Sequence, residues 1–152
     1  MDIQDTDFQR LIPELKLWND GSGIDIHRWI GCEGDHKHLI GYARILWPHF
    51  IEHDDCIFRE HLDTKNYQGW LARMKGNKTE VEAVMNHQHI VDLFSRSHKE
   101  RPTREVVCYL GQLMKEIWQA KLDRDFPSRR VKVTFFDLDD ILESHITFFQ
   151  ER

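Results

Sequence analysis

Histidines and carboxylates are concentrated in one run of the chain, WIGCEGDHKHLIGYARILWPHFIEHDDCIF, which covers residues 29–58. Six of the ten histidines lie between positions 27 and 61, and two more form the sequence HQH at positions 87 and 89. Neutral imidazole is the commonest protein ligand for transition metals, and it also carries protons near pH 7. The run therefore indicates a metal site, a catalytic site, or a polar rim around an ordinary core.

The spacing of the histidine pairs limits which of them could hold a common ion. Side chains that share a helix face are three or four residues apart, whereas side chains two apart share one side of a strand. His36 and His38 lie two apart at the start of a predicted helix, which would point them in different directions. His87 and His89 have the same mismatch, and no HExxH or zinc-finger pattern appears. The spacing favours solvated or capping histidines over a metal site.

One adjacent pair carries a resemblance to a known family. His53 and Asp54, in a chain that reads as mostly helical, resemble the core dipeptide of the HD-domain metal phosphohydrolases. The resemblance implies that a bound metal lowers the pKa of a water and polarises a phosphoryl oxygen. It also implies a downstream aspartate, for which Asp92 is the candidate. An upstream histidine would complete the site, and the candidates are His27, His36 and His38. The chain departs from the family because DCIF, rather than a clear helix, follows the pair.

Composition narrows the partners and the setting. The net charge of −5 is opposite in sign to the basic excess of proteins that bind nucleic-acid backbones, so no nucleic-acid partner is expected. The chain shows no apolar run of about 18 residues and no signal-peptide pattern, and its three cysteines form no CxxC pair. These features predict a cytoplasmic protein with no membrane partner. No P-loop, GxGxxG or GxSxG motif is present, so no cofactor is predicted.

The elements that position these residues are mostly helices. Pro13 interrupts the first apolar repeat, and Ser22 resembles the N-cap of the second, for which a strand is the competing interpretation. Asp35 caps the third repeat, and Asn77 with Glu80 makes a capping box at the fifth. Helices are predicted within residues 8–18, 22–30, 35–47, 67–76, 77–94 and 102–126.

Strand periodicity appears in two places. Residues 50–59 contain two short β-prone runs around Asp54-Asp55, which predict a small hairpin. Val131–Phe136 alternates apolar and polar residues, and His145–Phe149 is β-branched and aromatic. We expect these two segments to pair as an antiparallel C-terminal hairpin, with a helix over residues 141–149 as the competing interpretation. The fold class is α+β, with five or six helices and a small antiparallel sheet in one domain, residues 1–152.

The apolar stripes predict which side chains are buried. In the long helix, Leu110, Leu113 and Ile117 repeat every three or four residues and are expected in the core, where Leu110→Ala would cost about 2–5 kcal/mol. The run at residues 29–58 is expected to be a structural unit whose histidines line a polar rim. Its expected buried side consists of Trp29, Leu39, Ile40, Ala43, Leu46 and Trp47.

The sequence supports two functional hypotheses. The first is a small soluble protein-interaction domain, an inhibitor or adaptor of another protein, because no catalytic motif passes the spacing tests and aromatic residues are plentiful. Under it, neither a catalytic nor a metal-binding residue is assigned. The alternative is an HD-like metal-dependent hydrolase with His53, Asp54 and Asp92 in catalysis. Its metal ligands would be His36, His38, His53 and Asp54.

Overall fold

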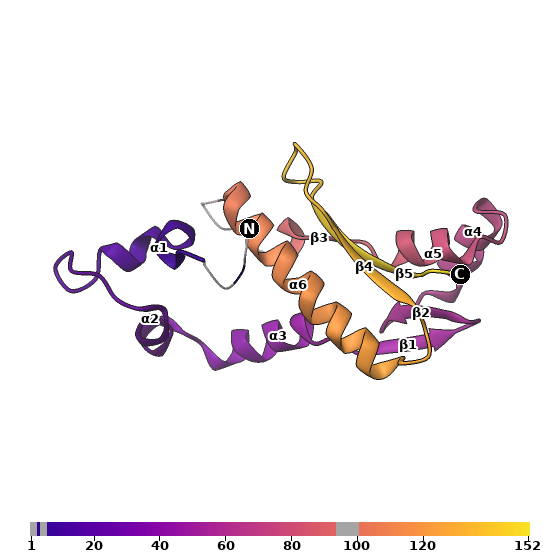
Figure 1. The fold of residues 1–152 in the computed structure, drawn as a ribbon, viewed down its shortest axis with the longest axis horizontal. Coiled ribbons are helices and arrows are strands. Elements are labelled where there is room, and N and C mark those ends of the chain that lie inside the picture. The colour runs from indigo at the N-terminus through magenta and orange to yellow at the C-terminus, as the bar shows by residue number, and fades with distance from the viewer. Residues whose placement is uncertain (1–2, 4–5, 94–100) are drawn as a thin grey trace.

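The computed structural model describes residues 3, 6–93 and 101–152, and these residues form an α+β fold, as predicted (Figure 1). The α-helices of the described residues are α1 (Phe8–Leu11), α2 (Ile26–Glu33), α3 (His36–Leu46), α4 (Thr64–Arg73), α5 (Lys78–Met85) and α6 (Arg104–Asp125). The strands are β1 (Phe50–His53), β2 (Cys56–Arg59), β3 (Gln88–His89), β4 (Val131–Phe136) and β5 (His145–Gln150). Two short 3-10 helices cover Pro13–Lys16 and Val91–Leu93.

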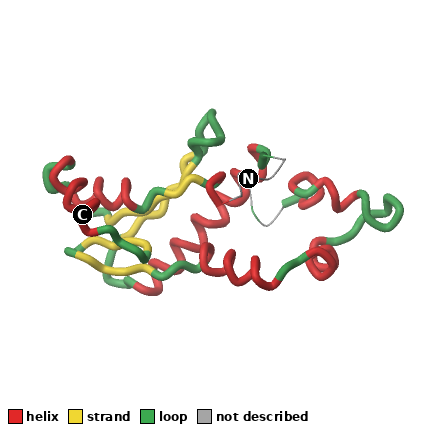
Figure 2. The backbone as a smooth tube through the Cα atoms, turned by 180° about the vertical axis from the view of Figure 1, so that it is seen from behind, coloured by secondary structure: helices red, strands yellow, loops and turns green. Residues whose placement is uncertain are grey.

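The molecule is elongated, and its two ends differ in secondary structure (Figures 1 and 2). Helices α1, α2 and α3 make up one end, and both sheets lie with α4 and α5 at the other. Helix α6 runs diagonally between the two ends. We call residues 6–47 the arm, and residues 48–93 with 101–152 the body. Among the described residues, no helix is both long and apolar enough to cross a membrane.

Local capping sets where the helices begin. Each α-helix of the described residues starts at a side chain that accepts a backbone N–H of the first turn, as expected for Asp, Asn and Thr caps. The predicted caps Asp35 and Asn77 are confirmed. Helix α2 is capped by Asp25 instead of Ser22, because positive φ angles at Gly21 and Gly23 hold the preceding residues in turns. The full set of caps is Asp7, Asp25, Asp35, Asp63, Asn77 and Thr103.

Helix α5 is shorter than its apolar spacing predicts. It ends at Met85 instead of continuing toward residue 94, and Gln88–His89 pairs antiparallel with β5 as strand β3. Pairing with a neighbouring strand satisfies the backbone of this segment as well as a helix would, and tertiary contact overrides local propensity. The last residue of the predicted helix, Phe94, lies outside the described residues.

Both predicted hairpins are confirmed. Strands β1 and β2 pair through a turn at Asp54 and Asp55, whose φ angles of 49° and 62° are the left-handed values that two-residue hairpin turns require. Strands β4 and β5 pair antiparallel, with Thr134 opposite Thr147. The second sheet has the order β3-β5-β4. Residues 145–149 are therefore strand, and the helical alternative for them is wrong.

Strand β5 is covered on both faces. Successive side chains of a strand point to opposite sides, and those of β5 contact a different helix on each side. Ile146 and Phe148 enter the main core together with Trp118 of α6. Thr147 points the other way, and its hydroxyl donates to the Ala83 carbonyl of α5 at 2.6 Å. Helix α6 thus covers one face of the sheet and α5 the other.

The buried stripe of α6 differs from the predicted one by a rotation of the helix. Leu110, Leu113 and Ile117 are only half-buried, so the prediction that they are core residues is wrong. The buried residues lie one position later, which turns the contact face by about 100°. Gly111 belongs to this face and admits the Phe135 ring, which a Cβ at that position would meet at 2.2 Å. The buried residues of α6 are Val107, Gly111, Met114, Trp118 and Leu122.

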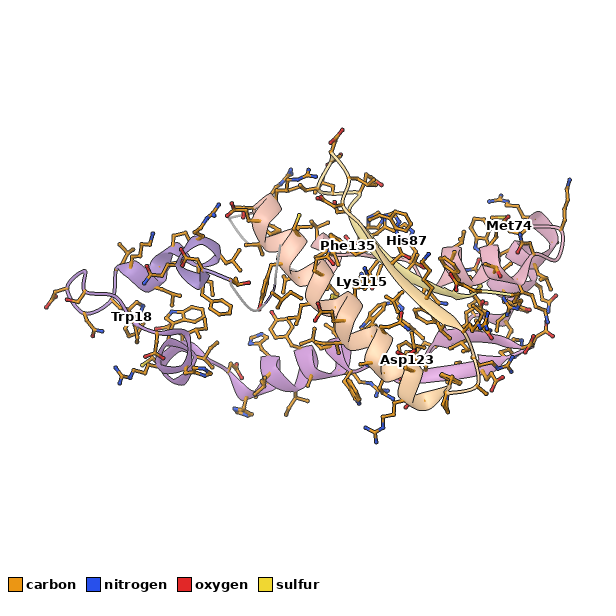
Figure 3. All side chains as sticks on the ribbon, viewed as in Figure 1. Trp18, Met74, His87, Lys115, Asp123 and Phe135 are labelled. Atoms are coloured by element: carbon orange, nitrogen blue, oxygen red, sulfur yellow. The ribbon has the colours of Figure 1, made fainter. Side chains whose placement is uncertain are left out.

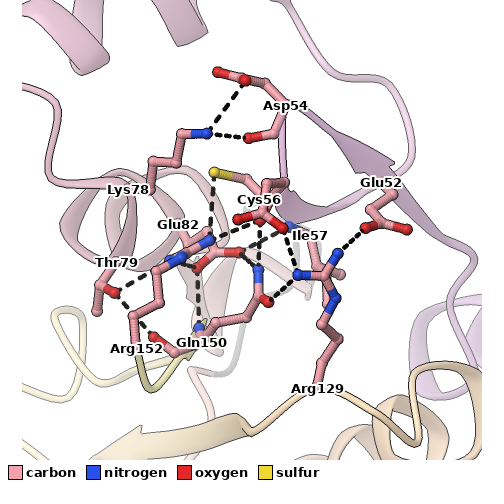
Figure 4. A network of polar contacts seen from close by, with 11 residues as sticks. Glu52, Asp54, Cys56, Ile57, Lys78, Thr79, Glu82, Arg129, Gln150 and Arg152 are labelled. Atoms are coloured by element: carbon pink, nitrogen blue, oxygen red, sulfur yellow. Dashed lines mark hydrogen bonds and ion pairs between the residues drawn. The ribbon is translucent and has the colours of Figure 1, made fainter.

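A buried carboxylate connects the two sheets (Figure 4). Glu82 of α5 is fully buried, and it accepts from the Ile57 N–H of β2 at 2.7 Å and from the Gln150 N–H of β5 at 2.9 Å. Arg152 also donates to it at 2.8 Å, which pairs the buried charge. One turn later, the Asn86 amide donates to carbonyls of both strands. These side chains supply hydrogen bonds between strands that belong to different sheets.

The arm buries little of its apolar surface. Leu15 is its only buried residue, and α2 and α3 have none. Leu39 and Ile40 are 68% and 69% exposed, and Trp47 is 42% exposed, so the expected buried face of α3 is wrong. Of that expected set, Leu46 packs partly against the main core, Trp29 is half-buried and Ala43 is exposed. The helical periodicity of α3 is confirmed. Lys121 of α6 lies over the Trp47 ring, but no element of the described chain covers Leu39 and Ile40.

Candidate functional site

The histidines that begin α3 are surface residues. The side chains of His36 and His38 are 83% and 76% exposed, and both lie near the carboxylate of Asp35, the residue that caps the helix. His38 also stacks on Tyr42 one turn later, with ring centroids 6.4 Å apart. These contacts belong to a solvated helix start, as the spacing indicates.

His53 and Asp54 occupy the turn of the β1–β2 hairpin. The Tyr67 hydroxyl donates to Asp54 at 2.5 Å, and Lys78 donates to the Asp54 carboxylate and carbonyl. The bond from Tyr67, followed by that from Lys78, lowers the pKa of the Asp54 carboxyl. The His53 ring packs edge-on against Tyr67. The nearby Cys56 thiol is buried, and burial raises its pKa, which leaves it protonated at neutral pH.

The catalytic residues of the HD-like alternative are distributed over separate elements. Asp92 lies in the 3-10 helix that follows β3, whereas His53 and Asp54 lie at the hairpin turn. Within residues 3, 6–93 and 101–152, no group of ligand atoms includes Asp92 with His53, or either of them with His36. The geometry gives the HD-like alternative no converging set of ligands among these residues.

A different histidine cluster does converge. His87, His89 and His145 are half-buried, and one ligand atom from each lies within 4.8 Å of the others. The Nε2 atoms of His87 and His89 are 3.0 Å apart. The rings of His87 and His145 stack with centroids 4.1 Å apart, and Phe136 stacks on His145 at 4.9 Å. Figure 3 shows His87 at the body sheet, far from Trp18 in the arm.

Strand pairing explains how three histidines meet here. His87 and His89 are separated by Gln88 in and beside β3, so their side chains share one side of the extended segment. His145 is the register partner of His89 on β5, and directly opposed residues in a sheet share a face. The predicted helix over residues 77–94 would have separated His87 from His89, and it is wrong at these two positions. A strand prediction for HQH would have placed His87 and His89 on one side of the segment. No local sequence pattern indicated that His145 lies beside them.

His87 is disfavoured in its charged form. Burial, followed by the neighbouring His145 and His89, lowers the pKa of His87 below its ordinary value. The Nδ1 atom of His145 lies 2.7 Å from the Glu143 carbonyl oxygen, so this nitrogen carries the hydrogen and donates it. In the neutral form of this ring, the lone pair is therefore on Nε2. The buried Nδ1 of His89 has no hydrogen-bond partner among the described residues.

A cleft of about 430 Å³ lies on the other side of β3. Gln88 points into it, opposite in direction to His87 and His89, and accepts from the Arg59 guanidinium at 2.8 Å. Arg59 also lies over the Trp118 ring, 5.6 Å from its centroid, and donates to the His87 carbonyl. The second cation of the cleft, Arg44, pairs with Glu60. Both guanidinium groups of this cleft are already engaged by the protein.

Comparison with known proteins gave no match, whether with protein-family models, with curated proteins or with solved structures. Function is therefore inferred from two features of the molecule itself, the apolar stripe of the arm and the histidine cluster of the body.

Proposed function

We propose that this protein is a protein-interaction domain, whose arm docks on an apolar surface of another polypeptide. The single observation that carries the proposal is the exposed stripe of α3. Leu39 and Ile40 are more than two-thirds exposed, and Trp47 continues the stripe two turns later. Burying a Leu or Ile side chain contributes about 1.5–3 kcal/mol, so a partner that covers this stripe gains substantial free energy.

The arm is attached firmly enough to present that stripe. Ile45 packs against the main core, and its carbonyl accepts from the Trp118 indole at 3.1 Å. At the other end of the arm, Arg10 forms an ion pair with Glu105 of α6, and the Phe8 ring packs edge-on against Tyr109. Contacts at both ends reduce the conformational entropy that binding would cost.

The charges of the arm indicate which kind of partner surface it would bind. The arm carries both acidic and basic residues, and the charges next to the stripe are Asp35, Lys37 and Arg44. A surface with mixed signs neither attracts a highly charged partner over a long range nor repels a neutral one. We therefore propose an apolar, nearly neutral partner surface, such as one face of an amphipathic helix. The three unpaired cysteines suit the reducing, cytoplasmic setting expected from the sequence.

Site-specific photo-crosslinking in cells that make the protein tests the proposal. A photoreactive residue at Ile40 should capture one defined polypeptide, whereas the same group at His38, an exposed position two residues away and therefore on another face of α3, should not. The captured polypeptide, purified, should then bind the full chain directly. Leu39→Asp with Ile40→Asp should weaken that binding more than about 100-fold, the equivalent of two buried apolar side chains, and His38→Gln should leave it unchanged.

Two outcomes would overturn the proposal. Equal capture at both positions would show that the stripe is not selective. Capture of a second copy of this chain, with a dimer in solution that Leu39→Asp and Ile40→Asp dissociate, would make the stripe a self-association surface instead of a docking site for another protein.

A further inference from the structure

We propose that His87, His89 and His145 form a binding site for a divalent transition-metal ion, zinc in particular. The site lies in the body, and it neither requires nor contributes to the docking role of the arm. It also differs from the HD-like set considered from the sequence, since it shares no residue with it. Three imidazoles plus an open fourth position constitute a well-established ligand set for zinc.

The distances agree with such a site. Two nitrogen ligands at 2.0–2.1 Å from a tetrahedral zinc ion are about 3.3 Å apart. The Nε2 atoms of His87 and His89 are already 3.0 Å apart, and the third ligand atom completes a group within 4.8 Å. The His145 ligand atom must move closer to the other two on binding, because 4.8 Å exceeds the separation of about 3.3 Å in a tetrahedral site.

The surroundings of His145 orient it as a ligand. A metal-bound histidine usually donates its second ring N–H to a carbonyl or carboxylate, which fixes the tautomer. The Glu143 carbonyl occupies that position at His145 Nδ1, at a distance of 2.7 Å. Phe136 covers one side of the same ring and Ile146 anchors the adjacent backbone in the core. The strand pair β3–β5 therefore supplies both the ligands and part of their support.

The three rings satisfy one another's polar atoms poorly. His87 and His89 share a single contact between like nitrogen atoms, in which only one can donate. The buried His89 Nδ1 has no partner among the described residues. Buried polar atoms without partners are uncommon in native proteins, but this nitrogen lies on the other side of the ring from Nε2, so it indicates a place for a bound water and not for the ion. An ion bound by lone pairs of three rings would connect β3 to β5 beyond the two register pairs of that short strand.

Zinc titration of the chelator-treated full chain, followed by calorimetry, tests the inference. We expect one zinc ion per chain, and a rise in melting temperature on adding zinc. His145→Gln and His87→Gln should each weaken binding more than about 100-fold, since even an outer-shell partner changes metal affinity by 10–100-fold. The matched control is His36→Gln with His38→Gln, which removes two exposed histidines at the same sequence spacing and should leave affinity within twofold.

A measurement on the wild-type chain keeps the test independent of whether the variants fold. Zinc should shift the imidazole NMR resonances of His87, His89 and His145 together, at one equivalent, and leave those of His36 and His53 in place. Cobalt(II) should give the intense visible absorption of a four-coordinate site. The inference would be overturned by an absence of saturable binding, by binding that the His36 and His38 changes abolish, or by equal shifts in all histidines.

Discussion

The arm and the body of this protein both contain amphipathic helices, yet they differ in how those helices are covered. In the body, α6 packs a continuous stripe from Val107 to Leu122 against β4 and β5. In the arm, α3 has an equally regular stripe, but Leu39 and Ile40 remain exposed. The difference teaches that periodicity identifies a helix and its approximate apolar side, whereas the exact buried face and the existence of a covering element depend on the rest of the chain or on a partner.

Trp118→Ala should produce the largest loss of stability in this comparison. The side chain is 1% exposed, contacts Phe50 and Phe148, and donates to the Ile45 carbonyl. Its removal leaves a cavity and an unpaired carbonyl, and it should cost about 3–5 kcal/mol. Urea unfolding of both proteins measures the difference. A loss below about 1 kcal/mol would mean that the body core is as loosely covered as the arm.

Glu82→Gln should cost less, about 2–3 kcal/mol. The change keeps the side-chain volume but replaces one acceptor oxygen by an NH2 group. In place of Oε1 that group faces donors from Ile57 and Gln150, and in place of Oε2 it faces donors from Gln150 and Arg152. The same denaturant titration applies, with Glu80→Gln on the exposed side of α5 as the control. If both changes have equal effects, the buried network does not hold the two sheets together.

Leu110→Ala should cost about 1–2 kcal/mol, near half the value of a fully buried leucine. Leu110 is half-buried and packs against the edge of the main core, whereas Met114 on the adjacent stripe is buried. Met114→Ala should therefore destabilise the protein more, by about 2–5 kcal/mol. The reverse order would indicate that α6 is rotated toward the stripe predicted from sequence.

Acid should weaken the β1–β2 turn through Asp54. Because Tyr67 and Lys78 lower the folded-state pKa of Asp54 below its usual 3.8, its contribution to stability is present above pH 3.8 and is lost as the pH falls through the folded-state value. Wild type should lose stability more steeply than Asp54→Asn in that acidic window. Parallel stability curves for the two proteins, measured by denaturant unfolding at each pH, would contradict this assignment.

Leu39→Ala in the arm should have the smallest effect on the isolated chain, below about 0.5 kcal/mol. The side chain is 68% exposed, so truncation creates no cavity. Thermal and urea unfolding should match the wild type within error. A cost above about 2 kcal/mol would show that the stripe is covered in solution, and it would remove the distinction between arm and body.

Local patterns determined much of this fold. The caps Asp35 and Asn77, the β1–β2 turn and the end of α6 before Pro127 follow from interactions within a few residues, and the β4–β5 hairpin follows from two strand patterns joined by a short connection. Such features can be read from sequence because the interacting groups are neighbours along the chain. For the same reason, the spacing of His36 and His38 was enough to predict that they would not converge.

Tertiary structure alone decided which surfaces are covered and which histidines meet. Asp25 caps α2 in place of Ser22 because of a local turn. By contrast, the HQH segment is a strand because it pairs with β5, which is distant in the sequence. That pairing brought His145 next to His89, 56 positions earlier in the chain, through strand register and not through any local motif. Long-range register and the presence of a covering element depend on the whole chain, so no window of the sequence contains them.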